Sequence, residues 1–149
     1  MLKIYLDSCC LSRPYDDLSD DAVRLESEAV MTIIARCEQG SWNICGSDVL
    51  IDEIDRISDR VKKDKVLALY TSTTEQVDLC EHIIRRAREL MALRVKPFDA
   101  LHLASAEYVN ADVFLSTDKR LVNAARRIAL GVKVYNPAVW LMEVLYNEQ

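Results

Sequence analysis

Short apolar runs alternate along this chain with longer segments of helical periodicity, and this alternation restricts the possible folds more than any other feature. The first run, residues 3–6, favours extended backbone and ends directly at Asp7. Such a run is typical of an inner strand of a parallel sheet, buried on both faces. Four further segments have strand character: residues 42–45, 73–77 (at a sheet edge), 113–115 and 132–135. Strands that alternate with helices predict an α/β fold, in which helices cover both faces of a parallel sheet.

Helices are expected between these strands, and local signals mark their ends. The first begins at about residue 19 and ends at Gly40, and Ser47 is expected to cap the second. The second helix has one apolar stripe, formed by Leu50, Ile54, Ile57 and Val61. Asp78 and Glu81 have the spacing of a capping box before the helix that continues to residue 93. Further helices are expected at residues 62–70, from Pro97 onward, at 121–130 and at 137–145, and a turn or loop at 8–17.

Composition is consistent with one domain over residues 1–149, because half of the residues are apolar and only three Gly and three Pro are present. No apolar run reaches the length of a membrane span and no signal-peptide pattern is recognisable, so we expect a cytoplasmic protein without membrane contact. The five cysteines are odd in number and form no CxxC pair, which favours free thiols over disulfides or structural zinc. The net charge of −5 is unusual for a nucleic-acid binder.

Four acidic residues stand where parallel sheets place their chemistry. Asp7 and Asp118 follow apolar strands, Asp99 lies in the first turn of the Pro97 helix, and Glu53 borders the buried side of its helix. Four carboxylates close together repel one another, which raises their pKa values. A divalent cation removes this repulsion, and ligands that are all oxygen suit Mg²⁺ or Mn²⁺.

Each of these acids also has a structural interpretation. Asp7 and Asp118 are possible caps of the segments that follow them, Asp99 suits a helix dipole, and Glu53 suits a solvent-facing rim. Spacing alone leaves these alternatives open beside a metal-dependent hydrolase.

The sequence resembles PIN-domain proteins, and among them the VapC-type toxin ribonucleases, over nearly its whole length. The motifs occur in the family's order: residues 5–8 (YLDS), Ser47 with Glu53 six residues later, residues 96–106 (KPFDALHLASA) and residues 115–121 (LSTDKRL). The segment around Asp99 is the most specific of them. The family implies a three-layer α/β/α sandwich with a central parallel sheet of four or five strands.

The resemblance also implies chemistry and partners. The acidic quartet is Asp7, Glu53, Asp99 and Asp118, which would hold Mg²⁺ or Mn²⁺ and hydrolyse RNA phosphodiester bonds. Ser8 and Ser116 match positions at which a small hydroxyl lies beside the carboxylates. The family further implies a toxin of a type II toxin–antitoxin pair, with an antitoxin partner, although the loop at residues 9–17 is not typical of VapC toxins.

Basic and apolar residues suggest two further contacts. Arg13, Lys96, Lys119 and Arg120 are near the acids in sequence and are candidates to hold RNA phosphates, although charge runs are also common on solvated helix faces. Members of this family commonly dimerise, and the helices at residues 62–70, 79–93 and 137–145 have more apolar residues than one core needs. The following residues cannot all face one core: Val66, Leu67, Leu69, Tyr70, Trp140, Leu141, Val144, Leu145 and Tyr146. This surplus predicts a homodimer through the apolar residues that the core leaves exposed.

Some of these residues also suit other roles or other folds. His102 is expected to be a structural, hydrogen-bonded histidine rather than a general base, and Trp42 and Trp140 are expected in the core. A HAD-type phosphatase needs a second aspartate where Cys9 stands, and the acidic pair of a receiver domain is not evident. The alternative that remains is a PIN fold that binds RNA or protein without nuclease activity.

Overall fold

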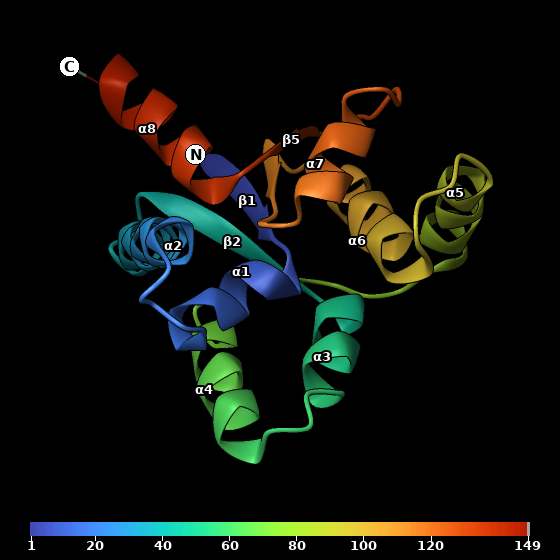
Figure 1. Ribbon diagram of the computed structural model, residues 1–149. Helices are drawn as coiled ribbons and strands as arrows, with labels where there is room; N and C mark the ends of the chain where they lie inside the picture. Colours follow the sequence, from blue (N-terminus) through green and yellow to red (C-terminus); the bar gives the residue numbers. More distant parts are fainter. Residues whose placement is uncertain (149) are drawn as a thin grey trace.

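The computed structural model describes residues 1–148, which form a five-stranded, all-parallel sheet (Figure 1). The strand order is β3-β2-β1-β4-β5. The strands are β1 Leu2–Leu6, β2 Trp42–Ser47, β3 Glu75–Val77, β4 Val113–Leu115 and β5 Lys133–Tyr135. β1 is the central strand, paired with β2 from Leu2 and with β4 from Ile4 onward. Asp7, which follows β1, therefore lies at the middle of the sheet's carboxyl edge.

Helices cover both faces of this sheet, which confirms the predicted three-layer sandwich. α2 and α8 pack together on one side, and α5 and α6 pack together on the other (Figure 1). The helices are α1 Ser8–Ser12, α2 Asp21–Glu38, α3 Asp48–Asp55, α4 Arg60–Tyr70, α5 Glu81–Ala92, α6 Pro97–Tyr108, α7 Lys119–Ala125 and α8 Pro137–Asn147. Among the described helices, none is long and apolar enough to cross a membrane.

The core is built around β1, because helices exclude water from both of its faces. Tyr5 has no exposed surface, and its ring stacks on Phe114 of β4 with the centroids 5.3 Å apart. Burial of one such side chain contributes about 1.5–3 kcal/mol to stability. Trp42 and Trp140 meet edge to face at 5.3 Å and are buried, so their expected place in the core is confirmed.

Residues 8–17, predicted as a loop, are largely helical instead. They form α1 and the short 3₁₀ helix η1, Arg13–Tyr15. The Asp7 side chain accepts a hydrogen bond from the Ser8 amide and so caps α1. The prediction was wrong because Cys10 and Leu11 bury a helical face that is too short for periodicity to reveal.

The expected helix through residues 48–61 is two helices. Ser47 caps α3 as predicted, accepting a hydrogen bond from the Leu50 amide at 3.0 Å. α3 ends at Asp55, and Asp59 caps α4 by accepting a hydrogen bond from the Lys62 amide at 3.2 Å. Val61 therefore belongs to α4, where it is exposed. The spacing of the apolar residues was helical across the boundary between α3 and α4, although the Asp59 cap starts a new helix there.

Two further helix ends differ from expectation. The capping box is wrong, because α5 begins after Cys80 and has no side-chain cap. α7 ends at Ala125 rather than near residue 130. The Glu107 carboxylate of α6 accepts a hydrogen bond from the Gly131 amide at 2.6 Å, which holds the chain in a turn before β5.

The predicted apolar surplus is mostly absent. Val66, Trp140 and Leu141 are buried, and Leu67, Leu69, Tyr70, Val144 and Leu145 are partly buried against the core. The expectation was wrong because α8 packs on α2, and α4 packs on α1 and α3. Of the residues named for the interface, Tyr146 alone is exposed.

Candidate active site

Four structural elements bring the predicted acids toward the carboxyl edge of the sheet. Asp7 follows β1, Asp118 follows β4, Glu53 lies on α3, and Asp99 lies in the first turn of α6. Asp7 and Glu53 offer ligand atoms within 4.8 Å of each other, and Asp99 and Asp118 line one pocket. Negative charge is therefore concentrated at this edge. Among the described residues, only His102 lies within ion-pair distance of these acids, at Asp7 and Glu53.

Asp7 is almost fully buried and is held by three donors. Its Oδ1 accepts the Ser8 amide at 2.8 Å, and its Oδ2 accepts the Ser116 hydroxyl at 2.9 Å and the Cys9 thiol at 3.5 Å. Burial raises the pKa of Asp7 and repulsion by Glu53 adds to this, while His102, Ser116 and Cys9 act in the opposite direction. The donors therefore fix the direction in which this carboxylate points.

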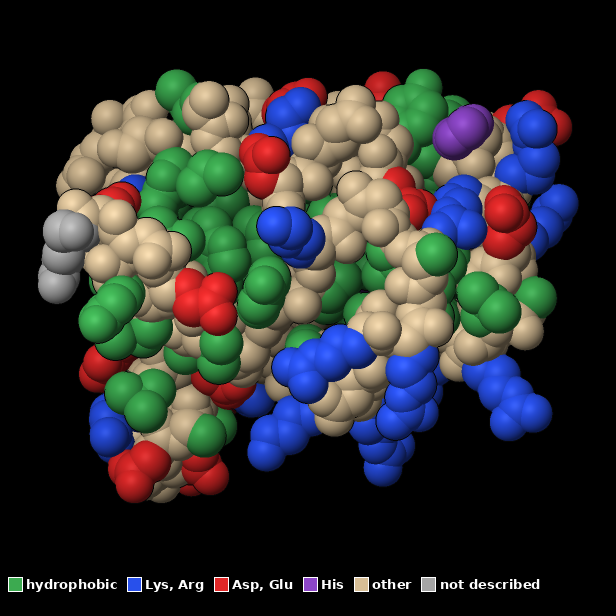
Figure 2. Space-filling model, turned by 90° about the horizontal axis from the view of Figure 1, so that it is seen from above, with side chains coloured by type: hydrophobic (Ala, Val, Ile, Leu, Met, Phe, Trp, Pro, Cys, Tyr) green, Lys and Arg blue, Asp and Glu red, His purple; other side chains and the backbone are tan. Residues whose placement is uncertain are grey.

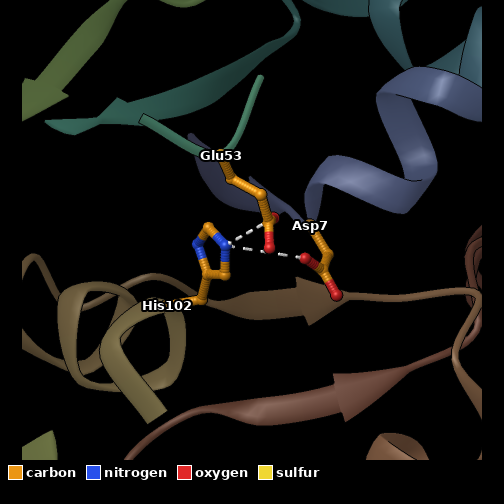
Figure 3. A group of neighbouring side chains, drawn as sticks. All are labelled: Asp7, Glu53 and His102. Carbon is orange, nitrogen blue, oxygen red and sulfur yellow. Dashed lines mark hydrogen bonds and ion pairs between the residues drawn. The ribbon is translucent and has the colours of Figure 1, made fainter. Parts of the chain in front are cut away.

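Glu53 is partly exposed and reaches the same place from α3. Its Oε1 accepts hydrogen bonds from the Ser8 hydroxyl and from His102 Nε2, the latter at 3.0 Å (Figure 3). Burial acts to raise the pKa of Glu53, but the hydrogen bonds from His102 and Ser8 bring it below its ordinary value. Glu53 is therefore a carboxylate at neutral pH, and no donor among residues 1–148 contacts its Oε2.

Asp99 differs from the other acids because no hydrogen bond from the described residues reaches its carboxyl group. Burial and then repulsion by Asp7, with smaller effects of Asp118 and Glu53, raise its pKa from 3.8 to about 6, while His102 opposes this rise. Asp99 and Asp118 line a pocket of about 200 Å³. A carboxylate without partners in such a pocket suits a cationic ligand.

Asp118 caps a helix as well as facing this pocket. Its Oδ1 accepts the amides of Arg120 and Leu121 at 3.0 and 3.4 Å, so the structural alternative holds for this atom. Among the described residues no donor contacts its Oδ2. Ser116 joins two of the acids, because its hydroxyl donates to Asp7 and accepts the Asp118 amide at 3.1 Å.

His102 lies inside this group of acids. Its ring is buried, with Nδ1 2.6 Å from the Tyr5 hydroxyl and Nε2 3.8 Å from Asp7 Oδ1 (Figure 3). Asp7, Glu53 and His102 each offer a ligand atom within 4.8 Å of the others'. Hydrogen bonding of His102 agrees with the sequence interpretation, but its contact with Glu53 was not foreseen. The available signal was its position one helical turn after Asp99.

The donor set at this edge fits a hard divalent cation. Asp7 and Glu53 lie within 4.8 Å of each other together with His102, and Glu53 has one oxygen without a donor in the described chain. Asp99 and Asp118 add carboxylate oxygens around the neighbouring pocket. Mg²⁺ and Mn²⁺ prefer such oxygen ligands and retain several waters. Cys9, whose thiol lies 3.5 Å from both Asp7 and Ser116, is a neighbour that the sequence reasoning did not place here.

The predicted phosphate contacts divide into two groups. Lys96 and Arg120 line the pocket with Asp99 and Asp118, as does Arg94, and Lys119 begins α7. Arg13 instead forms ion pairs with Asp16 and Glu26, both at 3.0 Å, which occupy its guanidinium group. Figure 2 shows Lys and Arg side chains gathered along one edge of the molecule despite its negative net charge.

Comparisons with solved structures show proteins of the same fold. A chain in the crystal structure of VapBC2 from Rickettsia felis, bound to a DNA fragment from their promoter, superposes with a TM-score of 0.59 at 14% identity, covering 91% of this chain and 98% of that chain. A chain in the crystal structure of DNA-bound VapBC from Salmonella typhimurium superposes with a TM-score of 0.58 at 15% identity, covering 92% and 99%. At these identities the likeness shows a shared fold.

No curated protein sequence matches the chain significantly. The family model described as the PIN domain, however, matches residues 4–127, which include all four acids. This match spans most of the sequence and begins and ends within the described fold. The chain therefore belongs to the PIN domain family.

Proposed function

We propose that this protein is a metal-dependent endoribonuclease in which Asp7, Glu53, Asp99 and Asp118 hold Mg²⁺ or Mn²⁺. The observation that carries the proposal is Asp99, a carboxyl group without a hydrogen-bond donor among the described residues. Burial and three neighbouring carboxylates raise its pKa to about 6. A side chain in this state is unfavourable in an isolated protein and becomes favourable beside a cation.

The side chains of this site have distinct tasks in phosphodiester hydrolysis. A divalent cation bound there would supply an activated water and stabilise the negative charge that develops on the phosphoryl oxygens. Ser8 and Ser116 hold Asp7 in one orientation, and Ser8 and His102 hold Glu53. Because these carboxylates are already oriented, less entropy is lost when they are positioned for the reaction.

RNA is the proposed substrate because of the family resemblance and because cationic side chains border the acids. Lys96, Arg94 and Arg120 line the same pocket as Asp99 and Asp118, where cationic side chains can bind the phosphates of a strand. Contacts of this kind hold the backbone and carry no sequence information. We therefore expect Lys96 and Arg120 to affect affinity for RNA generally.

The variants Asp7→Asn and Asp99→Asn test the function directly. Each keeps the shape of the side chain and removes its charge, so we expect RNA cleavage in Mn²⁺ to fall by at least about 100-fold. Asp64→Asn, an exposed aspartate of α4, is the matched control and is expected to cleave normally. Cleavage is measured on a mixed-sequence RNA with purified, folded variants.

Two outcomes would contradict this proposal. Full cleavage in excess EDTA would remove the need for a metal. RNA that binds to the wild type with Mn²⁺ present but is never cut would favour a PIN module that binds without nuclease activity.

We further propose that the protein acts in the cytoplasm as the toxin of a type II pair, with a cognate antitoxin as its partner and residues 1–149 as one domain. The fold shared with chains of two VapBC complexes supports this role. A small adjacent gene whose product binds this protein and inhibits cleavage is expected. If the neighbouring genes encode no protein that binds, the toxin role is wrong while the nuclease proposal stands.

A further inference from the structure

A row of four buried or partly buried side chains connects the interior of the protein to the acidic site. Ser47 Oγ lies 2.7 Å from the Tyr5 hydroxyl, which lies 2.6 Å from His102 Nδ1, and His102 Nε2 lies 3.0 Å from Glu53 Oε1. Ser47, Tyr5 and His102 have no exposed surface. Each comes from a different element: the end of β2, β1 and α6. Water therefore does not compete for the hydrogen bonds among these three residues.

The direction of the hydrogen bonds in this row follows from what each group can donate. A carboxylate only accepts, so the contact with Glu53 requires a hydrogen on His102 Nε2. Ser47 Oγ already accepts the Leu50 amide, and among the described residues the Tyr5 oxygen is the acceptor available to the Ser47 hydroxyl. If Ser47 donates to Tyr5, the Tyr5 hydroxyl donates to His102 Nδ1. In the reverse direction the buried Ser47 hydrogen would have no acceptor in the described chain, which is unfavourable.

The same row ties together the elements that carry the acids. Tyr5 is two residues before Asp7, Ser47 caps the helix of Glu53, and His102 is one turn after Asp99. The donors to Glu53, His102 and Ser8, both contact Oε1 and leave Oε2 without a protein donor among residues 1–148. A long, partly exposed side chain is thus held with one oxygen free toward the site.

We propose that His102 is a positioning residue whose Nε2 hydrogen, maintained by the Tyr5 hydroxyl, orients the Glu53 carboxylate for the divalent cation. This inference rests on the proposed function, since it concerns the same cation. It assigns His102 no place among the ligands, because a nitrogen that carries hydrogen has no lone pair to give a metal. Groups that orient a ligand in this way typically change metal affinity by about 10–100-fold when removed.

Nitrogen NMR of protein labelled with ¹⁵N-histidine tests the proposed tautomer without any metal. His102 is expected to carry its hydrogen on Nε2, with Nδ1 unprotonated, and exposed His82 serves as the internal reference. Tyr5→Phe removes the donor to Nδ1 and is expected to lose this strict preference. A hydrogen on Nδ1 alone in the wild type would overturn the inference.

Mn²⁺ binding, measured by titration calorimetry, tests the consequence. Tyr5→Phe and His102→Leu are each expected to weaken binding by about tenfold or more, whereas His102→Gln, whose amide can donate to Glu53, restores most of the affinity. Tyr108→Phe is the matched control, because no hydrogen bond of the described residues involves the Tyr108 hydroxyl. If His102→Leu does not fold, Tyr5→Phe, which removes one oxygen atom, decides the question.

The possible failures are distinguishable. A wild type that binds no Mn²⁺ contradicts the proposed function, and the inference with it. If the wild type binds Mn²⁺, and Tyr5→Phe and His102→Leu bind it equally tightly, the inference is wrong while the proposed function stands. Electron spin echo spectra of the Mn²⁺-loaded protein give a third test, since a directly bound ¹⁵N-histidine nitrogen would make His102 a ligand and overturn its positioning role.

Discussion

At the scale of single residues, the environment of Asp99 links function to stability. An aspartate ordinarily titrates near 3.8, and the pKa of Asp99 in the folded protein is about 6 because of burial and then repulsion, chiefly by Asp7. Between these values the folded state binds more protons than the unfolded state. The contribution of Asp99 to the free energy of unfolding therefore decreases as the pH rises from about 4 to 6 and remains unfavourable above that range.

Asp99→Asn is accordingly expected to stabilise the metal-free protein at pH 7 but not at pH 4. The expected increase in the free energy of unfolding is on the order of 1–2 kcal/mol, less than the full shift implies because Asp99 retains some solvent contact. Urea unfolding in EDTA at the two pH values measures it, with Asp64→Asn as control. An equal effect at both pH values, or destabilisation at pH 7, would show that the charge of Asp99 is not strained.

At the scale of elements, several segments of this fold begin at a residue that also belongs to the site. Asp7 caps α1, Ser47 caps the helix of Glu53, and Asp118 caps α7. A substitution at such a residue therefore changes helix stability and site chemistry together. Asp118 is the clearest case, because its Oδ1 caps the helix while its Oδ2 has no donor in the described chain.

The two roles of Asp118 are separable with two variants. Asn caps helices about as well as Asp, so Asp118→Asn is expected to leave the metal-free melting temperature nearly unchanged, whereas Asp118→Ala lowers the free energy of unfolding by about 0.5–2 kcal/mol. Both variants remove the charge and are expected to weaken Mn²⁺ binding. Thermal melts with EDTA and with Mn²⁺ give both quantities, and normal Mn²⁺ affinity in Asp118→Asn would leave Asp118 as a cap only.

At the scale of the whole molecule, we propose a homodimer, but through a different surface from the one the sequence suggested. Val139, Met142 and Tyr146 are exposed on α8 at helical spacing, and Leu25 of α2 lies with Met142 around one groove of about 280 Å³. Hydrophobic side chains gather in this region of the surface (Figure 2). An exposed apolar stripe on two packed helices is typical of an interface with two-fold symmetry.

Light scattering at micromolar concentration is expected to give twice the chain mass of 17.0 kDa. Met142→Lys with Tyr146→Lys introduces charge into this apolar surface and is expected to yield monomers. Val61→Lys, an exposed apolar residue on α4, is the matched control and is expected to remain dimeric. A wild-type monomer at all concentrations would refute the dimer, and a dimer that persists in the double variant would place its interface elsewhere.

Local sequence patterns determined the strands of this protein and the position of three acids. Apolar runs identified β1, β2, β4 and β5, and Pro97 marked the start of α6, because strand periodicity and helix starts are encoded by residues within a few positions of one another. Asp7, Asp99 and Asp118 were placed at element ends for the same reason. β3 was expected as a short edge strand although its residues are mostly polar.

Tertiary structure alone decided how these ends are used. Helices α3 and α4 separate where a second cap competes with the apolar stripe, and the turn before β5 is held by a hydrogen bond from Gly131 to Glu107 of another helix. Similarly, the hydrogen bond between Tyr5 and His102 joins residues 97 positions apart, and the one between His102 and Glu53 joins residues 49 positions apart. No local pattern specifies such contacts, because they depend on which strands become neighbours and on which side chains meet when water is excluded.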